Sequence, residues 1–284
     1  CVYEVRGKRK MKLISMKDVQ KGSLEILKKI DEICSQLNLK YCLAYGTLIG
    51  AIRHKGFIPW DDDVDIMMPR KDYNLLVNYF VEHKEELKPF EIINPQVNNK
   101  CPYTISRISD SRYQLDVDNE DDYGIGLFVD VYPLDGVGNT VASYSKLKNT
   151  SSRFASMCFL STRQSVKREN TKSALKYMIK FPAFVVAKML GKAFFMNKLY
   201  NMAAKCDYDN SKYIGCIIWA SDDGLRGIFP KEWFDEMIDV EFEGAYFKAP
   251  KEYDKVLTHG YGDYMKLPPE KDRIAHHYYD AYRK

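Results

Sequence analysis

The stretch that decides the fold is residues 41–70, YCLAYGTLIGAIRHKGFIPWDDDVDIMMPR. Its apolar start predicts a strand from Tyr41 to Tyr45. A Gly46-Thr47 turn follows, in which glycine permits a close turn and Thr47 caps a short helix over 48–54. An acidic strand is predicted over 60–68, because a proline stands just before it and another at its end.

Side chains alternate between the two faces of a strand, so Asp61, Asp63 and Asp65 share one face if the strand begins near Asp61. By the same parity, Asp62 points to the other face. Carboxylates held this close repel one another, and a hard divalent cation such as Mg²⁺ or Mn²⁺ removes the conflict. The alternative is a solvated acidic turn. An EF-hand is excluded, because its loop needs Gly at the position of Ile66 and Glu at the position of Asp72.

A second acidic residue stands alone in residues 124–136, GIGLFVDVYPLDG, which read as an apolar strand and a turn. A buried Asp130 is costly as a charge unless something pairs with it. A metal held by Asp63 and Asp65 is one such partner, and backbone amides at a strand end are the alternative. Arg107, within a predicted strand over 103–109, either contacts a phosphate or pairs with a carboxylate.

The composition is that of a soluble globular protein. The chain has 284 residues, 45% hydrophobic and 29% charged, with a net charge of +4 that does not by itself indicate nucleic acid. Residues 1–15 are predicted to be a basic N-terminal arm, and 16–284 a single domain. The seven Cys form no C-x-x-C pair, which favours free thiols in a reducing compartment. No signal peptide is visible and the longest apolar run is far shorter than the about 20 residues of a spanning helix, so a cytoplasmic protein is expected.

The segment 140–210 is predicted to be a helical, basic subregion. Within it, residues 172–200 interleave Lys with Phe, Met, Leu and Val, with Pro182 and Gly191 as expected breaks. Such a segment is either a core helix with lysines that reach the solvent or a surface that lies on an anionic membrane. No nucleic-acid partner is expected, because no recognition motif accompanies the charge.

Together these features predict a metal-dependent phosphoryl or nucleotidyl transfer site. Turn amides at a helix N-terminus favour phosphate, and carboxylates on adjacent strands hold metal ions against it. Arg53 and Lys55, between the two, add positive charge where a leaving nucleotide phosphate needs it.

The run AYGTLIGAIRHKGFIPWDDDVDIMMPR at residues 44–70 closely resembles the LicD/fukutin family. FVDVYPLDG (128–136) and YDKVLTHGYGDYMKLPPE (253–270) resemble two further blocks of that family. The resemblance implies an α+β fold, with a nucleotidyltransferase-like mixed β-sheet, packed helices and a helical, basic insertion. It also implies that 16–284 form one LicD-type catalytic domain.

The reaction that the resemblance implies is transfer of a phospho-alcohol from a CDP-activated donor to a sugar hydroxyl, with release of CMP. CDP-choline is the favoured donor, and CDP-ribitol and CDP-glycerol are alternatives. The acceptor is a surface glycan or teichoic acid precursor, and a lipid-linked acceptor would place the enzyme at the cytoplasmic face of the membrane. The implied metal ligands are Asp61, Asp63, Asp65 and Asp130, with Asp61 or Asp130 as base. The expected substrate contacts are Gly46, Thr47, Arg53, Lys55, Trp60, Arg107 and Tyr132.

Three rival functions remain open on the sequence. A D-x-D glycosyltransferase would normally place a nucleotide-binding strand–helix repeat before the acidic motif, where this chain has one helix and one strand. A true nucleotidyltransferase shares the metal site but releases pyrophosphate. A non-enzymatic scaffold is disfavoured by the intact acidic set. A quaternary ammonium donor would favour an aromatic cage, for which Trp60, Tyr123 and Tyr132 lie nearest the motifs.

Overall fold

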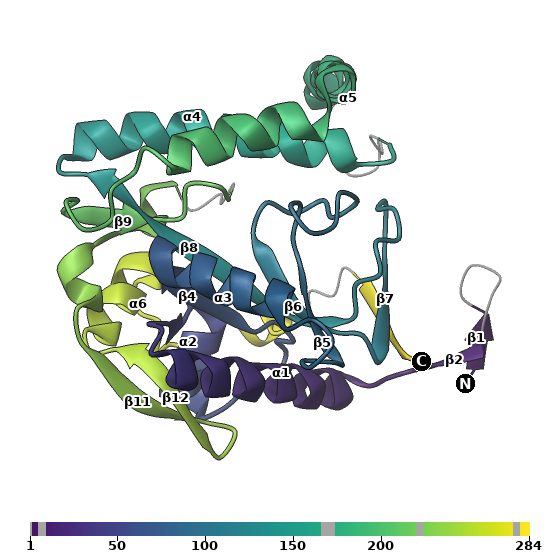
Figure 1. Ribbon diagram of the computed structural model, residues 1–284, viewed down its shortest axis with the longest axis vertical. Helices are drawn as coiled ribbons and strands as arrows, with labels where there is room; N and C mark the ends of the chain where they lie inside the picture. Colours follow the sequence, from purple (N-terminus) through teal and green to yellow (C-terminus); the bar gives the residue numbers. More distant parts are fainter. Residues whose placement is uncertain (1, 5–9, 166–173, 220–223, 275–278) are drawn as a thin grey trace.

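Strand β8 (Leu127–Gly138) is the centre of the main sheet, in a computed structural model that describes residues 2–4, 10–165, 174–219, 224–274 and 279–284 (Figure 1). Residues 127–137 are all buried, as expected of a strand covered on both faces. β8 pairs in parallel with β4 and antiparallel with β6 and β9. The sheet is therefore mixed, which confirms the predicted α+β class.

The described part of the main sheet has the strand order β10-β9-β8-β4-β3, with β6 and then β5 branching from β8. The bounds of its other strands are β3 (Cys42–Leu43), β4 (Asp65–Pro69), β5 (Phe90–Ile93), β6 (Ser106–Asp110), β9 (Tyr213–Gly215) and β10 (Ile228–Pro230).

Helix α1 (Met16–Leu37) begins at a capping box in which Ser15 and Asp18 satisfy each other's backbone amides. Its apolar stripe, which includes Ile26 and Ile30, is buried against β8 and β6. Helix α3 (Arg70–Glu82) packs on β4, β5 and β8. Helices α2 (Tyr45–His54) and α6 (Tyr253–Tyr261) contact each other. The hairpin of β11 (Met237–Phe242) and β12 (Ala245–Pro250) contacts α2 and β3 and turns at Glu243-Gly244.

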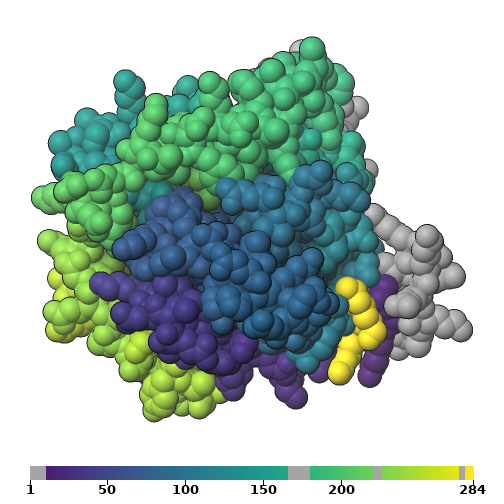
Figure 2. Space-filling model, viewed as in Figure 1, coloured from purple at the N-terminus to yellow at the C-terminus, as the bar shows by residue number. Residues whose placement is uncertain are grey.

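The helical subregion consists of α4 (Val141–Thr162) and α5 (Ala174–Ala203), which pack on each other while α4 also contacts β8. In the space-filling view it covers one side of the molecule, away from the hairpin (Figure 2). The helical backbone of α5 is interrupted at Gly191, where φ is 73°, as expected. The expected break at Pro182 is wrong. Pro182 lies inside the helix, and in the described part of α5 the backbone leaves the helical conformation only at Gly191.

A second sheet, in the order β1-β2-β13-β7, joins the two ends of the described chain. Its strands are β1 (Val2–Glu4), β2 (Lys10–Leu13), β7 (Tyr113–Val117) and β13 (Tyr279–Arg283). None of them was predicted from the sequence: β2 and β7 alternate apolar and polar residues, but over only four and five residues. Part of the predicted basic arm is thus strand β2, which pairs with β13.

The boundaries within residues 41–70 differ from those predicted. β3 is only two residues long, and α2 already begins at Tyr45, so Gly46 and Thr47 occupy its first turn. Ala44 is the N-cap residue, and the expectation that Thr47 caps the helix is wrong. The acidic strand begins at Asp65, so residues 61–64 form a loop that leads into it.

Candidate active site

Three side chains form a row across the main sheet: Asp65 on β4, Asp130 on β8 and Arg107 on β6. Asp65 is the register partner of Asp130 in the parallel pair, and Asp130 is the register partner of Arg107 in the antiparallel pair. Directly opposed residues of neighbouring strands project from the same face. All three line one cavity of about 840 Å³, which Asp63 and Tyr132 also line. The sheet thus brings together five of the predicted site residues.

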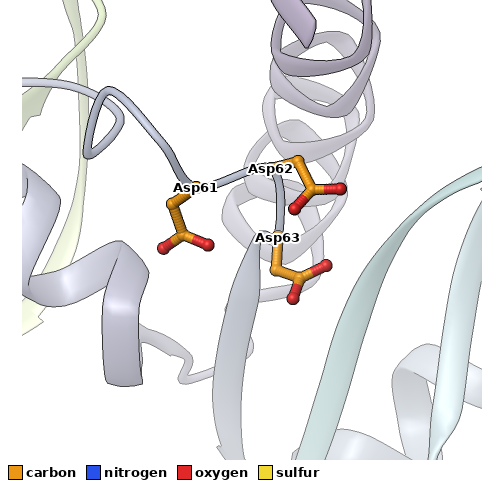
Figure 3. Close-up of side chains that lie close together, drawn as sticks. All are labelled: Asp61, Asp62 and Asp63. Carbon is orange, nitrogen blue, oxygen red and sulfur yellow. The ribbon is translucent and has the colours of Figure 1, made fainter. Parts of the chain in front are cut away.

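The acidic loop adds a second group of carboxylates beside this row. Asp61, Asp62 and Asp63 each offer an oxygen, and these oxygens all lie within 4.8 Å of one another (Figure 3). Because residues 61–64 precede the strand, the parity argument that separated Asp62 from Asp61 does not apply. Asp62 is buried, and its Oδ2 accepts a 2.6 Å hydrogen bond from Tyr279 Oη on β13. This group of hard oxygen donors can hold a divalent metal ion.

The first turn of α2 fixes the position of the acidic loop. Thr47 Oγ1 accepts a 2.9 Å hydrogen bond from the amide of Asp65 and donates a 3.5 Å bond to the carbonyl of Asp63. Gly46 leaves room for the side chain of Asp61, since a Cβ at that position would lie 2.7 Å from Asp61 Oδ2. Thr47 therefore positions the backbone that carries Asp63 and Asp65.

Burial and mutual repulsion disfavour the charged forms of these acids. Burial, followed by the charges of Asp62 and Asp130, raises the pKa of Asp63 to about 8. Burial and the charge of Asp130 raise the pKa of Asp65 well above its ordinary value. Burial also raises the pKa of Asp130, although Arg107 opposes that shift. A divalent cation would reverse the conflict, so the donor set fits the predicted Mg²⁺ or Mn²⁺.

Arg107 pairs with a carboxylate. Its Nε donates to Asp130 Oδ1 at 2.7 Å and its Nη2 to Oδ2 at 3.4 Å. The guanidinium lies over the rings of Tyr103 and Phe128, at 3.6 and 4.0 Å from their centroids. Since Arg107 also lines the cavity, it places a fixed positive charge beside Asp130 and Asp65.

Five expected substrate contacts, and the expected ligand Asp61, do not line the cavity. Of the described residues that do, none is Gly46, Thr47, Arg53, Lys55, Trp60 or Asp61. Arg53 donates to the carbonyl of Tyr264 at 2.6 Å, and Lys55 is the exposed C-cap of α2. For Arg53 and Lys55 the physical reason is that the first turn of α2 bonds to the acidic loop, and a ten-residue helix carries its C-terminal end about 15 Å away.

The sequence is similar to that of known proteins over most of its length. Residues 38–154 match the family described as LicD/FKTN/FKRP, nucleotidyltransferase domain. The chain is 32% identical over 259 residues to the lipopolysaccharide cholinephosphotransferase LicD of Haemophilus influenzae, which covers 89% of this chain and 92% of that protein. This chain belongs to the LicD family.

Shorter stretches of this LicD-family chain match two uncharacterised Rickettsia proteins. The R. prowazekii protein is 36% identical over 105 residues, 37% of this chain and 33% of that protein. The R. typhi protein is 44% identical over 48 residues, 17% of this chain and 16% of that protein.

The part of the chain that matches the family model contains the acidic loop and Asp130 but ends within α4. Several cavity residues lie beyond it, among them Phe159 at the end of α4, Arg163 just after it, and Trp219. The sequence analysis missed these, as it missed Tyr103 and Glu120, because no local motif marks a residue that only tertiary packing brings to the cavity. The helical subregion thus contributes Phe159 and Arg163 to the cavity wall.

Proposed function

We propose that this LicD-family protein transfers phosphocholine from CDP-choline to a hydroxyl of a surface glycan and releases CMP. The observation that carries the proposal is the row of Asp65, Asp130 and Arg107 in a cavity that also contains Asp63. The relationship to a cholinephosphotransferase along nearly its whole length supports choline as the alcohol. CDP-ribitol and CDP-glycerol are the alternative donors, and a lipopolysaccharide or a teichoic acid precursor is the acceptor.

In the proposed reaction, the acceptor oxygen forms a bond to the phosphorus that carries choline. The bond from that phosphorus to the bridging oxygen breaks, and CMP leaves with the bridging oxygen. The proton of the acceptor hydroxyl passes to Asp61 or Asp130. Arg107 stabilises the charged form of Asp130, whereas burial raises its pKa, so both acids stay candidates for this role.

The ion would be held by Asp63, Asp65 and Asp130, with Asp61 beside them. When bound, Mg²⁺ or Mn²⁺ neutralises charge on the diphosphate and on the leaving CMP. The protein contributes positioning. Thr47 bonds to the carbonyl of Asp63 and to the amide of Asp65, and Arg107 is held against Asp130 by a hydrogen bond.

Calorimetry with four donors tests the proposal. CDP-choline, CDP-ribitol, CDP-glycerol and CDP-ethanolamine are titrated in Mg²⁺ and again in EDTA, and the products are assayed for CMP and pyrophosphate. We expect metal-dependent binding of CDP-choline and release of CMP. Binding of a nucleotide sugar or a free nucleoside triphosphate, with none of the four donors bound, would instead identify a glycosyltransferase or a nucleotidyltransferase.

We also propose that the acceptor is lipid-linked and that α5 rests on the anionic cytoplasmic face of a membrane. Helix α5 carries no Asp or Glu. Its exposed apolar side chains recur at helical spacing, and they are Phe181, Val185, Val186, Met189, Leu190 and Phe194. Met189 is 81% exposed. Exposed Lys180, Lys188 and Lys198 stand among them. A basic, apolar helix face of this kind matches the interface of an anionic bilayer.

The helices of the described part of the chain include none with the length and apolar character needed to cross a bilayer.

A further inference from the structure

We propose that the cavity binds the donor through a cation subsite, in which a corner of aromatic rings and the buried carboxylate of Glu120 receive a quaternary ammonium group. The inference rests on the proposed function, since it identifies which alcohol the CDP-activated donor carries. It also assigns the residues that select that alcohol.

The aromatic corner begins beside the acidic row. Tyr132 lies two residues beyond Asp130 on β8, so both project from the same face of the sheet. The ring of Trp219 stands nearly perpendicular to that of Tyr132, at 84° with centroids 5.9 Å apart. Tyr103 lies 6.1 Å from Trp219, and Phe159 lies 6.3 Å from Tyr103. All four rings line the cavity. Arg107 and Arg163 already lie over one face of Tyr103 and of Phe159, each at 3.6 Å, so Trp219 and Tyr132 are the rings that would receive a ligand cation that has lost its water.

Glu120 supplies the second, independent observation. Its side chain lines the same cavity and is 2% exposed. Oε1 accepts a 2.7 Å hydrogen bond from Tyr103 Oη and pairs with Arg163 Nη1 at 2.8 Å. Oε2 has no hydrogen-bond partner among the described residues, and the same is true of Nε and Nη2 of Arg163. Arg163 pairs with Oε1 only, so a cation in the neighbouring aromatic corner would compensate the remaining oxygen without needing a hydrogen bond.

Two more acids increase the negative potential of this part of the cavity. Asp116 on β7 and Asp280 on β13 are direct register partners, and both line the cavity. Their carboxylates add negative charge to the cavity wall, which favours a cation there. The donor's diphosphate is an anion and would be repelled by this wall. The donor would therefore bind with its cationic end toward these acids.

The position of Trp219 is fixed by the helical subregion. Lys148 of α4 is buried and donates to the carbonyls of Trp219 and Cys216, at 3.1 and 3.3 Å. The backbone at Trp219 is therefore held in place before any ligand binds. Aromatic faces offer a polyol no hydrogen bonds, so the same corner would disfavour ribitol and glycerol. The subsite thus accounts for selection of choline over the other alcohols.

The test compares two donors of equal shape and different charge. Wild-type protein with Mg²⁺ is titrated with CDP-choline and with its neutral carbon isostere, the CDP ester of 3,3-dimethylbutanol. We expect about 10- to 30-fold tighter binding of the charged donor. Trp219→Ala should remove that preference and weaken CDP-choline binding by a similar factor, whereas affinity for CMP stays unchanged. Trp219→Phe, which keeps a ring face, should restore part of the loss.

Matched controls separate the subsite from general damage. Trp233→Ala removes a tryptophan that packs on His259 and does not appear among the described residues of the cavity wall. Glu120→Gln removes the buried charge, and Glu25→Gln removes a half-exposed one that pairs with Arg112. Glu120→Gln should lower the charge preference, and neither control variant should change it. Unchanged CMP affinity reports that each variant is folded.

Three results would overturn the inference, and they can be told apart from failure of the proposed function. Equal wild-type affinity for the charged and neutral donors would do so without any substitution. If Trp219→Ala still binds CMP and still prefers CDP-choline over the neutral donor, the aromatic corner does not bind the cation. The proposed phosphotransferase activity would be unaffected by that result. Binding of CDP-ribitol in place of CDP-choline would also reject the subsite. If no CDP-alcohol binds, the proposed function itself is wrong.

Discussion

Asp65 and Asp130 are register partners on the neighbouring parallel strands β4 and β8, and both side chains line the same cavity. Asp63 lies two residues before Asp65 and lines the cavity as well. The fold therefore holds like charges together in a buried place, which a folded protein tolerates only when something opposes the repulsion. Arg107 does so for Asp130. A divalent cation would do so for the other two.

Removing one of these charges should stop catalysis without unfolding the protein. Asp65→Asn is nearly isosteric and removes a repelling charge, so we expect turnover to fall by about 10²–10³-fold or more while the metal-free melting temperature stays the same or rises. CMP release and thermal melts measure the two effects. Asp239→Asn, on the surface beside Lys248, is the control and should keep full turnover. Wild-type turnover in Asp65→Asn would reject this assignment.

Metal binding should depend on pH because the raised pKa of Asp63, about 8, means that this carboxyl is largely protonated at pH 7 in the metal-free protein. The metal takes the charged form, so binding releases a proton. Affinity for Mn²⁺ should therefore fall as pH is lowered from 8 to 6, by about tenfold per pH unit for each proton displaced. Calorimetry in buffers of different ionisation enthalpy measures the released protons. A pH-independent affinity over this range would contradict the prediction.

Thr47 should matter for the position of the acidic loop. Thr47→Val preserves the shape of the side chain but removes the hydroxyl that bonds to the amide of Asp65 and the carbonyl of Asp63. We expect the free energy of unfolding to fall by about 1–3 kcal/mol and turnover to fall by about tenfold or more. Urea unfolding and CMP release measure these changes. Thr47→Ser keeps the hydroxyl and should behave like the wild type; a defect as large as that of Thr47→Val would count against this role.

The membrane proposal predicts a charge-dependent association of α5 with vesicles. Lys180→Glu, Lys188→Glu and Lys198→Glu together should lower binding to vesicles rich in phosphatidylserine, and have no effect with phosphatidylcholine alone. Sedimentation with the vesicles measures this difference. Lys192 is unsuitable for such a test because its Nζ donates to the carbonyls of Asn99 and Cys101 and so holds α5 in place.

The control for this experiment changes lysines on the opposite side of the molecule. Lys248→Glu and Lys251→Glu alter exposed charges on and beside the hairpin of β11 and β12. They should leave vesicle binding unaltered. Equal binding by the α5 variant and the wild type would mean that this helix face meets something other than an anionic bilayer.

The acidic chemistry was predictable from the sequence because it is local. Asp61, Asp63 and Asp65 follow one another within five residues, and Asp130 interrupts a strongly apolar run. The α+β class was implied by the resemblance of residues 44–70, 128–136 and 253–270 to the LicD/fukutin family. The predicted boundaries were wrong: the acidic strand begins at residue 65 in place of 60, and the helix begins at 45 in place of 48. Those depend on which backbone groups find tertiary partners, as when the amide of Asp65 bonds to Thr47.

The sequence by itself therefore determined a carboxylate site suited to phosphoryl transfer, since that arises from residues close together along the chain, and its resemblance to the LicD/fukutin family implied the class of fold. Only the tertiary structure decided which side chains share the cavity. It excluded Arg53, Lys55 and Trp60 from the described lining, although they flank the motif. It brought in Glu120, Phe159 and Trp219, because strand register and the packing of α4 join segments as far apart along the chain as Asp63 and Asp280, at small free-energy differences that no local pattern records.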